Sequence, residues 1–74
     1  MTKAQAARVA MQKLTASQSV GTLVQGFEIT EEVHTPEVSI VRGEIMDELE
    51  RRDAVAFDAW IDSNEGSPRR FFIK

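Results

Sequence analysis

The chain of 74 residues contains no cysteine and one histidine. It therefore has no disulfide to stabilise a small core, and one histidine cannot complete a tetrahedral Cys/His zinc site. A chain this short forms one domain that buries a modest fraction of its surface and often needs further stabilisation. We predict a single small domain over residues 1–74, with mobile ends at residues 1–3 and 66–74, completed by self-association or by a partner.

Long apolar runs are also missing. No window approaches the roughly 18 to 20 apolar residues of a membrane span, and the N-terminus lacks the apolar run of a secretion signal. Residues 1–19 are acid-free, basic and rich in Ala, Ser and Gln, which also describes an organelle transit peptide, but their removal would leave too little core to fold. We expect a soluble, cytoplasmic protein without a membrane partner.

Acidic residues are absent from both ends of the chain. All twelve lie between Glu28 and Glu65, whereas residues 1–27 and 66–74 each carry three bases and no acid. Such segregation bears on solubility and association more than on fold. It favours either folding of the basic ends onto the acidic middle or their use in binding a partner.

Two segments have clear helix starts. Thr2 can cap a first helix over residues 3–16, whose apolar stripe is weak because alanine buries little surface, so this helix needs another element to lie on. Thr35-Pro36-Glu37 starts a second helix over residues 36–51, because it offers an N-cap hydroxyl, a proline at the first helical position and a carboxylate in the first turn.

The apolar positions change phase near Arg52, which indicates a break between two helices. Asp53 can cap a third helix over residues 54–63, and Asn64-Glu65-Gly66 with Pro68 follow it as stop signals. The last two helices are expected to form a corner or a hairpin.

Residues 22–30 allow two interpretations. Leu23, Phe27 and Ile29 are separated by even numbers of residues, so they would lie on one face of a β-strand. Gly26 interrupts the run, which is typical of a short strand or hairpin. However, no Asn-Gly or Asp-Gly turn marks a hairpin, so the same residues also fit an apolar connector that fills the helical core.

These patterns predict a mainly α fold, a small three-helix domain with or without a short strand or hairpin near residues 22–30. Asp47 with Arg51 and Glu48 with Arg52 are predicted to form ion pairs on the solvent face of the second helix. The predicted core draws on all three helices and consists of Met11, Leu14, Val38, Val41, Ile45, Leu49, Phe57, Trp60 and Ile61.

Motifs for catalysis and metal binding are not found. A Ser-His-Asp triad would need a nucleophile turn such as Gly-x-Ser-x-Gly, and the four glycines are too scattered for a phosphate-binding loop. Glu31 and His34 have the Glu-x-x-His spacing of di-metal sites, but the required second copy of this motif is absent. We expect no enzyme activity, no cofactor and no metal.

The second helix contains a local inversion of its polarity. Arg42 lies close to the apolar stripe, whereas Ile40 points to the polar side. Either these residues contact a partner, or Arg42 extends past the core to a carboxylate and Ile40 lies under the N-terminal segment. Gly43 costs about 1 kcal/mol relative to Ala, so it marks either a close approach by another backbone, from the first helix or from a second copy, or an imperfection that the helix tolerates.

The C-terminal segment Arg69-Arg70-Phe71-Phe72-Ile73-Lys74 also has two interpretations. Its apolar residues can fold back to complete the core while its arginines lie on the acidic helices. Alternatively, the segment is presented outward as a strand or an apolar anchor for another protein. The small size of the core elsewhere favours the docked arrangement.

Residues 35–63, TPEVSIVRGEIMDELERRDAVAFDAWIDS, resemble short open reading frames of unassigned function in actinobacteria and their phages. The shared elements are the Thr35-Pro36-Glu37 cap and the two helices that follow. The resemblance covers under half of the chain and implies no activity.

The predicted function is a non-catalytic protein-interaction or regulatory module, monomeric or homodimeric, that binds a protein partner or itself. One alternative is a nucleic-acid-associated accessory protein that uses its basic termini, because aromatic residues beside arginines can stack on bases. Another is an inhibitor whose acidic helices imitate DNA. The residues expected to bind a partner are Ile40, Arg42, Trp60, Arg69, Arg70, Phe71 and Phe72.

Overall fold

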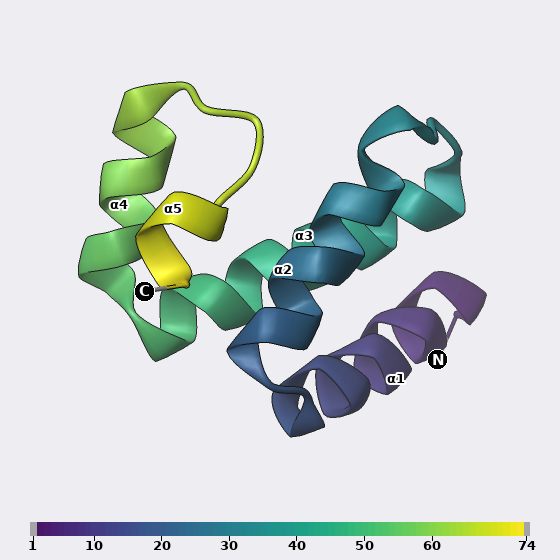
Figure 1. Cartoon of the computed structure of the whole chain (residues 1–74). Coiled ribbons are helices and arrows are strands. Elements are labelled where there is room, and N and C mark those ends of the chain that lie inside the picture. The colour runs from purple at the N-terminus through teal and green to yellow at the C-terminus, as the bar shows by residue number, and fades with distance from the viewer. Residues whose placement is uncertain (1, 74) are drawn as a thin grey trace.

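The computed structural model of the chain describes residues 2–73, which contain helices and no strand. The helices are α1 (Lys3–Ser17), α2 (Val20–Ile29), the 3-10 turn η1 (Thr30–Glu32), α3 (Pro36–Arg52), α4 (Ala54–Ser63) and α5 (Arg69–Phe72). α1 and α2 both lie along α3, and α4 and α5 lie together beyond the C-terminal end of α3 (Figure 1). The predicted mainly α class is confirmed.

Residues 20–29 form a helix, so the strand or hairpin considered for residues 22–30 is wrong. Ser19 starts this helix, because its hydroxyl accepts a hydrogen bond from the Thr22 backbone N–H at 3.1 Å. Leu23 and Phe27, four residues apart, lie on its buried face, whereas Ile29, which shares their strand parity, is 69% exposed. The apolar residues therefore follow the helical period. With α2 and α5 added, the chain has five α-helices in residues 2–73 and not three.

The predicted helix ends agree with the structure to within one residue. Thr2 and Gln5 form a reciprocal capping box at the start of α1. Thr35 caps α3, and the carboxylate of Asp53 caps α4 by accepting from the Ala56 N–H at 3.0 Å. α4 ends at Asn64, which adopts the left-handed conformation with φ 59° that commonly terminates helices.

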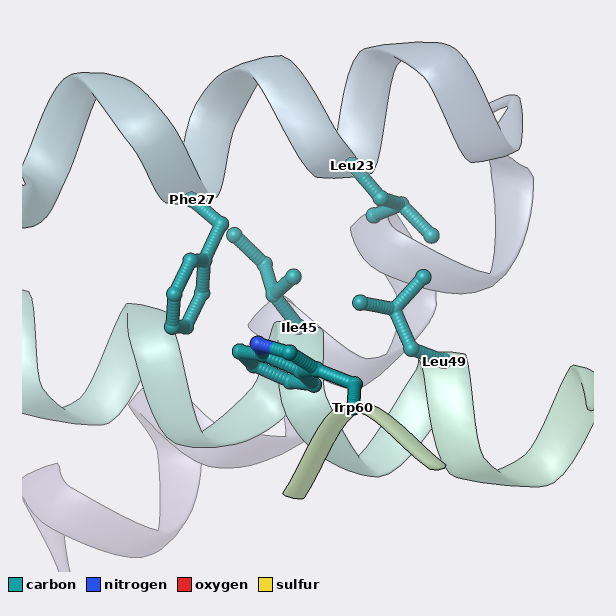
Figure 2. Packing of buried hydrophobic residues seen from close by; sticks show 5 residues of the cluster. All are labelled: Leu23, Phe27, Ile45, Leu49 and Trp60. Atoms are coloured by element: carbon teal, nitrogen blue, oxygen red, sulfur yellow. The ribbon is translucent and has the colours of Figure 1, made fainter. Parts of the chain in front are cut away.

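The core lies where α2, α3 and α4 meet (Figure 2). The rings of Phe27 and Trp60 pack edge to face with centroids 5.3 Å apart, and Phe57 packs on Trp60 in the same manner. The Trp60 indole N–H donates to the carbonyl of Glu65 at 2.8 Å, so the buried ring leaves no polar group unsatisfied. The buried cluster consists of Leu23, Phe27, Ile45, Leu49 and Trp60.

Two residues predicted for the core lie on the surface instead. Leu14 is 52% exposed and Ile61 is 46% exposed. The sequence predicts that Leu14 of the first helix fills part of the core. In the structure α2 packs there instead, and its side chains Leu23 and Phe27 fill that part of the core. α1 consequently has only one buried residue, Thr15. The helix with the weakest apolar stripe is also the one least covered by the rest of the chain.

The C-terminal segment has the docked arrangement. Phe71 and Phe72 pack against the buried cluster, partly covered. Arg69 pairs with Glu28 of α2 at 2.7 Å, and Arg70 pairs with Glu65 at 2.6 Å. Met1 and Lys74, which belong to the ends predicted to be mobile, lie outside the described residues.

None of the helices formed by residues 2–73 has both the length and the hydropathy needed to cross a bilayer.

Gly43 provides a test of local stability in α3. Apart from its chain neighbours and the backbone of its own helix, nothing lies within 4 Å of a Cβ built at this position, so another backbone does not approach Gly43 closely within the described chain. Gly43→Ala should therefore raise the free energy of unfolding by about 1 kcal/mol, because alanine has the higher helix propensity. Urea denaturation measures the change.

Gly66→Ala is the contrasting variant. A Cβ at Gly66 would lie 2.9 Å from Oε1 of Glu31, so a side chain there displaces that carboxylate and should bring no comparable gain. A loss of stability in Gly43→Ala would contradict the open environment of Gly43.

Candidate functional site

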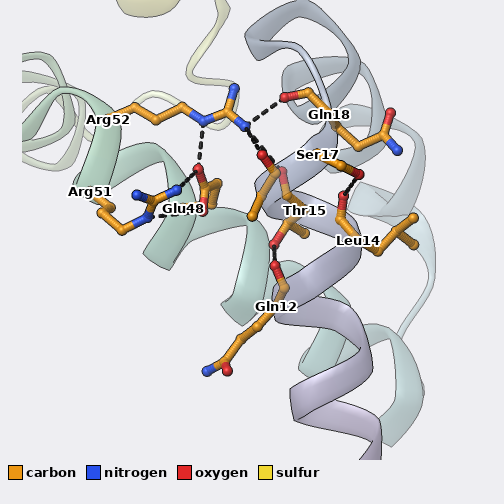
Figure 3. A network of polar contacts seen from close by, with 9 residues as sticks. Gln12, Leu14, Thr15, Ser17, Gln18, Glu48, Arg51 and Arg52 are labelled. Carbon is orange, nitrogen blue, oxygen red and sulfur yellow. Dashed lines mark hydrogen bonds and ion pairs between the residues drawn. The ribbon is translucent and has the colours of Figure 1, made fainter.

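Arg52, the last residue of α3, binds the C-terminal end of α1. Its Nη2 donates to the carbonyl oxygens of Thr15, Ala16 and Gln18 at 3.1, 3.3 and 2.5 Å (Figure 3). α1 has no basic residue in its own last turn. A cation at this position satisfies free carbonyl groups and is favoured by the helix dipole. Arg52 therefore supplies the C-terminal charge that α1 lacks.

Arg42 has the equivalent role for α2. Its Nη1 donates to the Phe27 carbonyl at 3.0 Å and to the Thr30 hydroxyl at 3.1 Å, and its guanidinium lies 3.9 Å from the centre of the Phe27 ring. α2 also lacks a basic residue in its last turn. The sequence analysis predicted that Arg42 contacts either a carboxylate or a partner. In the structure Arg42 instead binds the C-terminal end of α2 and the face of the Phe27 ring.

Glu48 holds Arg52 in place. The carboxylate is 6% exposed and accepts from Arg51 Nη2 at 2.5 Å and from Arg52 Nε at 2.6 Å. Burial alone would raise the pKa of Glu48, but hydrogen bonds from Arg52 and Arg51 outweigh this effect, so the pKa lies below its ordinary value. The prediction of a solvent-face pair is thus wrong for Glu48, and Arg51 pairs with Glu48 and not with Asp47.

Most residues predicted to bind a partner contact their own chain. Trp60 is buried at 4% exposure, Phe71 and Phe72 pack on the core, and both C-terminal arginines pair with carboxylates. Ile40 is half-buried beside α1 and lines a polar hollow of about 470 Å³ together with Arg8, Gln12, Ser39, Gly43, Glu44 and Asp47. A partner-binding role for these residues stays a prediction.

The two basic flanks differ in their contacts. The arginines of the C-terminal flank lie on carboxylates, as one of the two sequence alternatives proposed. The bases of α1 take part in none of the ion pairs found among residues 2–73, and α1 itself contains no acid. Lys3 and Lys13 therefore leave positive charge on the exposed side of α1, whereas Arg8 lines the hollow beside Glu44 and Asp47 of α3.

An apolar groove lies between α1 and α2, which diverge from the short turn that joins them (Figure 1). It encloses about 320 Å³ and is lined by Met11, Leu14, Thr15, Gln18, Thr22, Leu23 and Ile45. Leu23 and Ile45 belong to the buried cluster, so the groove is continuous with the core. Leu14 forms its exposed edge. Sequence reasoning missed this groove because it placed Leu14 in the core and did not identify α2 as a helix.

The side chains that could hold a metal ion are dispersed in the part of the chain that the structure describes. No group of three or more His, Cys, Asp or Glu side chains in residues 2–73 is arranged to hold a metal ion. Glu31 and His34, which have the spacing of a di-metal motif, are both exposed. The apolar groove contains no titratable side chain among its lining residues. The residues that line the groove therefore favour contact with an apolar surface of a ligand.

Replacement of Arg52 tests the connection between α3 and α1. Arg52→Gln should lower the free energy of unfolding by about 2 kcal/mol, because three carbonyl groups lose their donor and Glu48 loses one of its two cations. Amide hydrogen exchange should increase most in α1. Arg51→Gln is the matched control, because Arg51 also binds Glu48, but its side chain is 66% exposed and its hydrogen bonds within residues 2–73 are made with Glu48 and not with the carbonyl groups of α1. Equal effects of the two changes would contradict the role assigned to Arg52.

The pKa of Glu28 provides a test of the docking of the C-terminal segment. Hydrogen bonds from Arg69 and Ser67 lower the pKa of Glu28 from 4.5 to about 2. Because the folded pKa is depressed, the contribution of Glu28 to stability is present above about pH 4.5 and is lost as the pH falls towards about 2. In an NMR titration of the side-chain carboxyl carbons, Arg69→Ala should return the pKa of Glu28 towards 4.5. Arg70→Ala, which removes the pair with Glu65, should leave it low; a Glu28 pKa unchanged by Arg69→Ala would refute the docked contact.

Comparisons of the chain with protein-family models, with curated proteins and with solved structures gave no match. The resemblance of residues 35–63 to actinobacterial and phage reading frames stays a prediction.

Proposed function

We propose that this chain is a non-catalytic protein-interaction module that binds through the groove between α1 and α2. The observation that carries the proposal is the exposure of Leu14, at 52%, on the edge of an apolar groove whose inner wall is the core itself. A helix laid in such a groove would cover Leu14 and Met11 without disturbing the buried cluster. Apolar surface of this kind is typical of interaction sites.

The weak packing of α1 supports the same proposal. α1 has 15 residues, of which only Thr15 is buried. A helix of this length is marginal in water unless an apolar face is packed against something. Contact with a partner would provide the burial that the chain itself does not give to α1.

A nucleic-acid role has less support. The C-terminal arginines are paired with Glu28 and Glu65, and the aromatic residues beside them are packed on the core. The bases of α1 remain, but α3 beside them exposes Asp47, which would repel phosphate. The balance of exposed groups therefore favours a protein partner.

Site-specific photo-crosslinking tests the proposed function. The photoreactive residue p-benzoylphenylalanine in place of Leu14 should give protein cross-links in the cells that produce this chain, because the groove brings a partner next to it. The same residue in place of Val55, which is 81% exposed on α4, should give several-fold fewer. Equal cross-linking at both positions would argue against the groove as the binding site.

A further inference from the structure

We propose that the polar hollow between α1 and α3 binds the primary ammonium group of a small organic amine. The two helices lie side by side, and the hollow of about 470 Å³ shares no lining residue with the groove between α1 and α2 (Figure 1). The inference therefore goes beyond the proposed function and does not rest on it. It follows from a buried carboxylate without a cation, from the open space at Gly43 and from the oxygen acceptors around them.

Glu44 of α3 is the buried carboxylate. It is 8% exposed, and it takes part in none of the ion pairs and side-chain hydrogen bonds found among residues 2–73. Glu48, one turn further along the helix, is buried to a similar degree but accepts from two arginines. A carboxylate removed from water is costly unless a cation or hydrogen-bond donors compensate it. Glu44 therefore lacks the partner that Glu48 has.

The carboxylate of Glu44 faces open space. Glu44 lines the hollow and also a second, smaller one of about 320 Å³ beside Glu48. No fully buried side-chain oxygen in the described part of the chain lacks a hydrogen-bond partner, so the Glu44 oxygens reach the water of these two spaces. Asp47 is exposed and lines both spaces as well. A cation in the hollow would thus meet two carboxylates.

Gly43 keeps the hollow open. Outside its own helix and its chain neighbours, a Cβ built at this residue meets nothing within 4 Å, and Gly43 is one of the residues that line the hollow. A glycine inside a helix lowers the stability of that helix relative to alanine. A larger side chain at this position would project into the hollow, so space for a ligand is what the glycine provides.

The lining of the hollow suits an ammonium group. Besides the two carboxylates, it contains the amide of Gln12 on α1 and the hydroxyl of Ser39 on α3. Oxygen acceptors on both helices match a group that has three N–H donors and no acceptor. No aromatic side chain lines the hollow, whereas quaternary ammonium ions are commonly held on aromatic faces. Ile40 offers an apolar wall to the carbon chain of the amine.

Arg8 also lines the hollow, but it leaves the two carboxylates unpaired. It is exposed, and it forms no ion pair with Glu44 or Asp47 within the described residues. With two acids and one base, the lining stays negative. Arg8 should therefore weaken the binding of a second cation by repulsion but not prevent it.

An NMR titration with n-butylamine at neutral pH tests the site. We expect saturable changes in the amide chemical shifts of Gln12, Ser39 and Gly43. The Kd should lie in the millimolar range, because a ligand with few atoms gains little affinity. n-Butanol, which lacks the charge, and tetramethylammonium, which lacks N–H donors, should not produce these changes at the same concentrations. Equal changes with either control would overturn the inference.

Three variants locate the ammonium group. Glu44→Gln should weaken binding roughly tenfold or more, because it removes the charge and keeps the shape. Glu50→Gln removes an exposed carboxylate of the same helix outside the hollow and should leave binding unchanged. Gly43→Leu should abolish binding by filling the hollow, while the higher helix propensity of leucine keeps the fold stable in urea denaturation. Undiminished binding to Glu44→Gln or to Gly43→Leu would refute the site.

Arg8→Gln separates a ligand site from an internal ion pair. It should tighten amine binding about two- to fivefold by removing a repelling charge, and it should leave the free energy of unfolding unchanged. If Arg8 itself paired with Glu44 in solution, Arg8→Gln and Glu44→Gln would each lower the free energy of unfolding, and the double variant would lower it no further. That result would overturn the inference.

A lysine side chain of another protein carries the same group as a free amine. The hollow has the size of a small-molecule site, and Ile40 is the one large apolar side chain in its lining, so the free amine is favoured. p-Benzoylphenylalanine in place of Ser39, which is exposed at the hollow, should therefore give no more protein cross-links in cells than the same residue in place of Glu50. Protein cross-links specific to position 39 would overturn the assignment to a free amine. Cross-links from position 14 without amine binding would refute this site and leave the proposed function standing.

Discussion

The position of α1 depends on one ion pair, between the buried carboxylate of Glu48 and the guanidinium of Arg52. Glu48 is nearly inaccessible to water, and a lone carboxylate there would be costly. Its two arginines offset this cost, and one of them, Arg52, is thereby oriented so that its remaining donors reach the end of α1. Because α1 contributes so little burial of its own, this polar contact fixes where α1 lies on α3. The groove between α1 and α2 exists because of that placement.

The equivalent contact of Arg42 shows how the same chemistry acts on a well-packed helix. α2 buries Leu23, Val24 and Phe27, so apolar burial sets its position. Arg42 adds only a positive charge at the C-terminal end of this helix. α1 has an equivalent cation, Arg52, at its C-terminal end, but it buries almost none of its side chains. The two helices are therefore attached to α3 by similar contacts but with unequal strength, and α1 is the element most open to a further partner.

Elements with strong end signals were predictable from the sequence, and those defined by competition for the core were not. Thr35-Pro36-Glu37 and Asp53 fixed the ends of α3 and α4, because caps act locally. α2 was missed because its apolar run is short and fits both periods, although Ser19 marks its start. Trp60 was predicted both for the core and for partner binding, and it lies in the core; Phe71 and Phe72 pack on the buried cluster, which is the docked arrangement that the sequence favoured. The groove could not be predicted from the sequence, because it forms only when α2 packs in the core and α1 lies outside it.

In the proposed interaction module, the weak attachment of α1 would couple the local stability of this helix to the binding of a partner in the groove. A partner in the groove binds only those molecules in which α1 is folded and held by Arg52, so any opening of α1 lowers the apparent affinity by the fraction of molecules that are open. By the same linkage, a bound partner stabilises α1 and the Arg52 contact with it. Changes at Arg52, which does not line the groove itself but binds the carbonyl groups of its lining residues Thr15 and Gln18, would then alter that binding. Such coupling would be a physical route by which an interaction module of the proposed kind could act as a regulator.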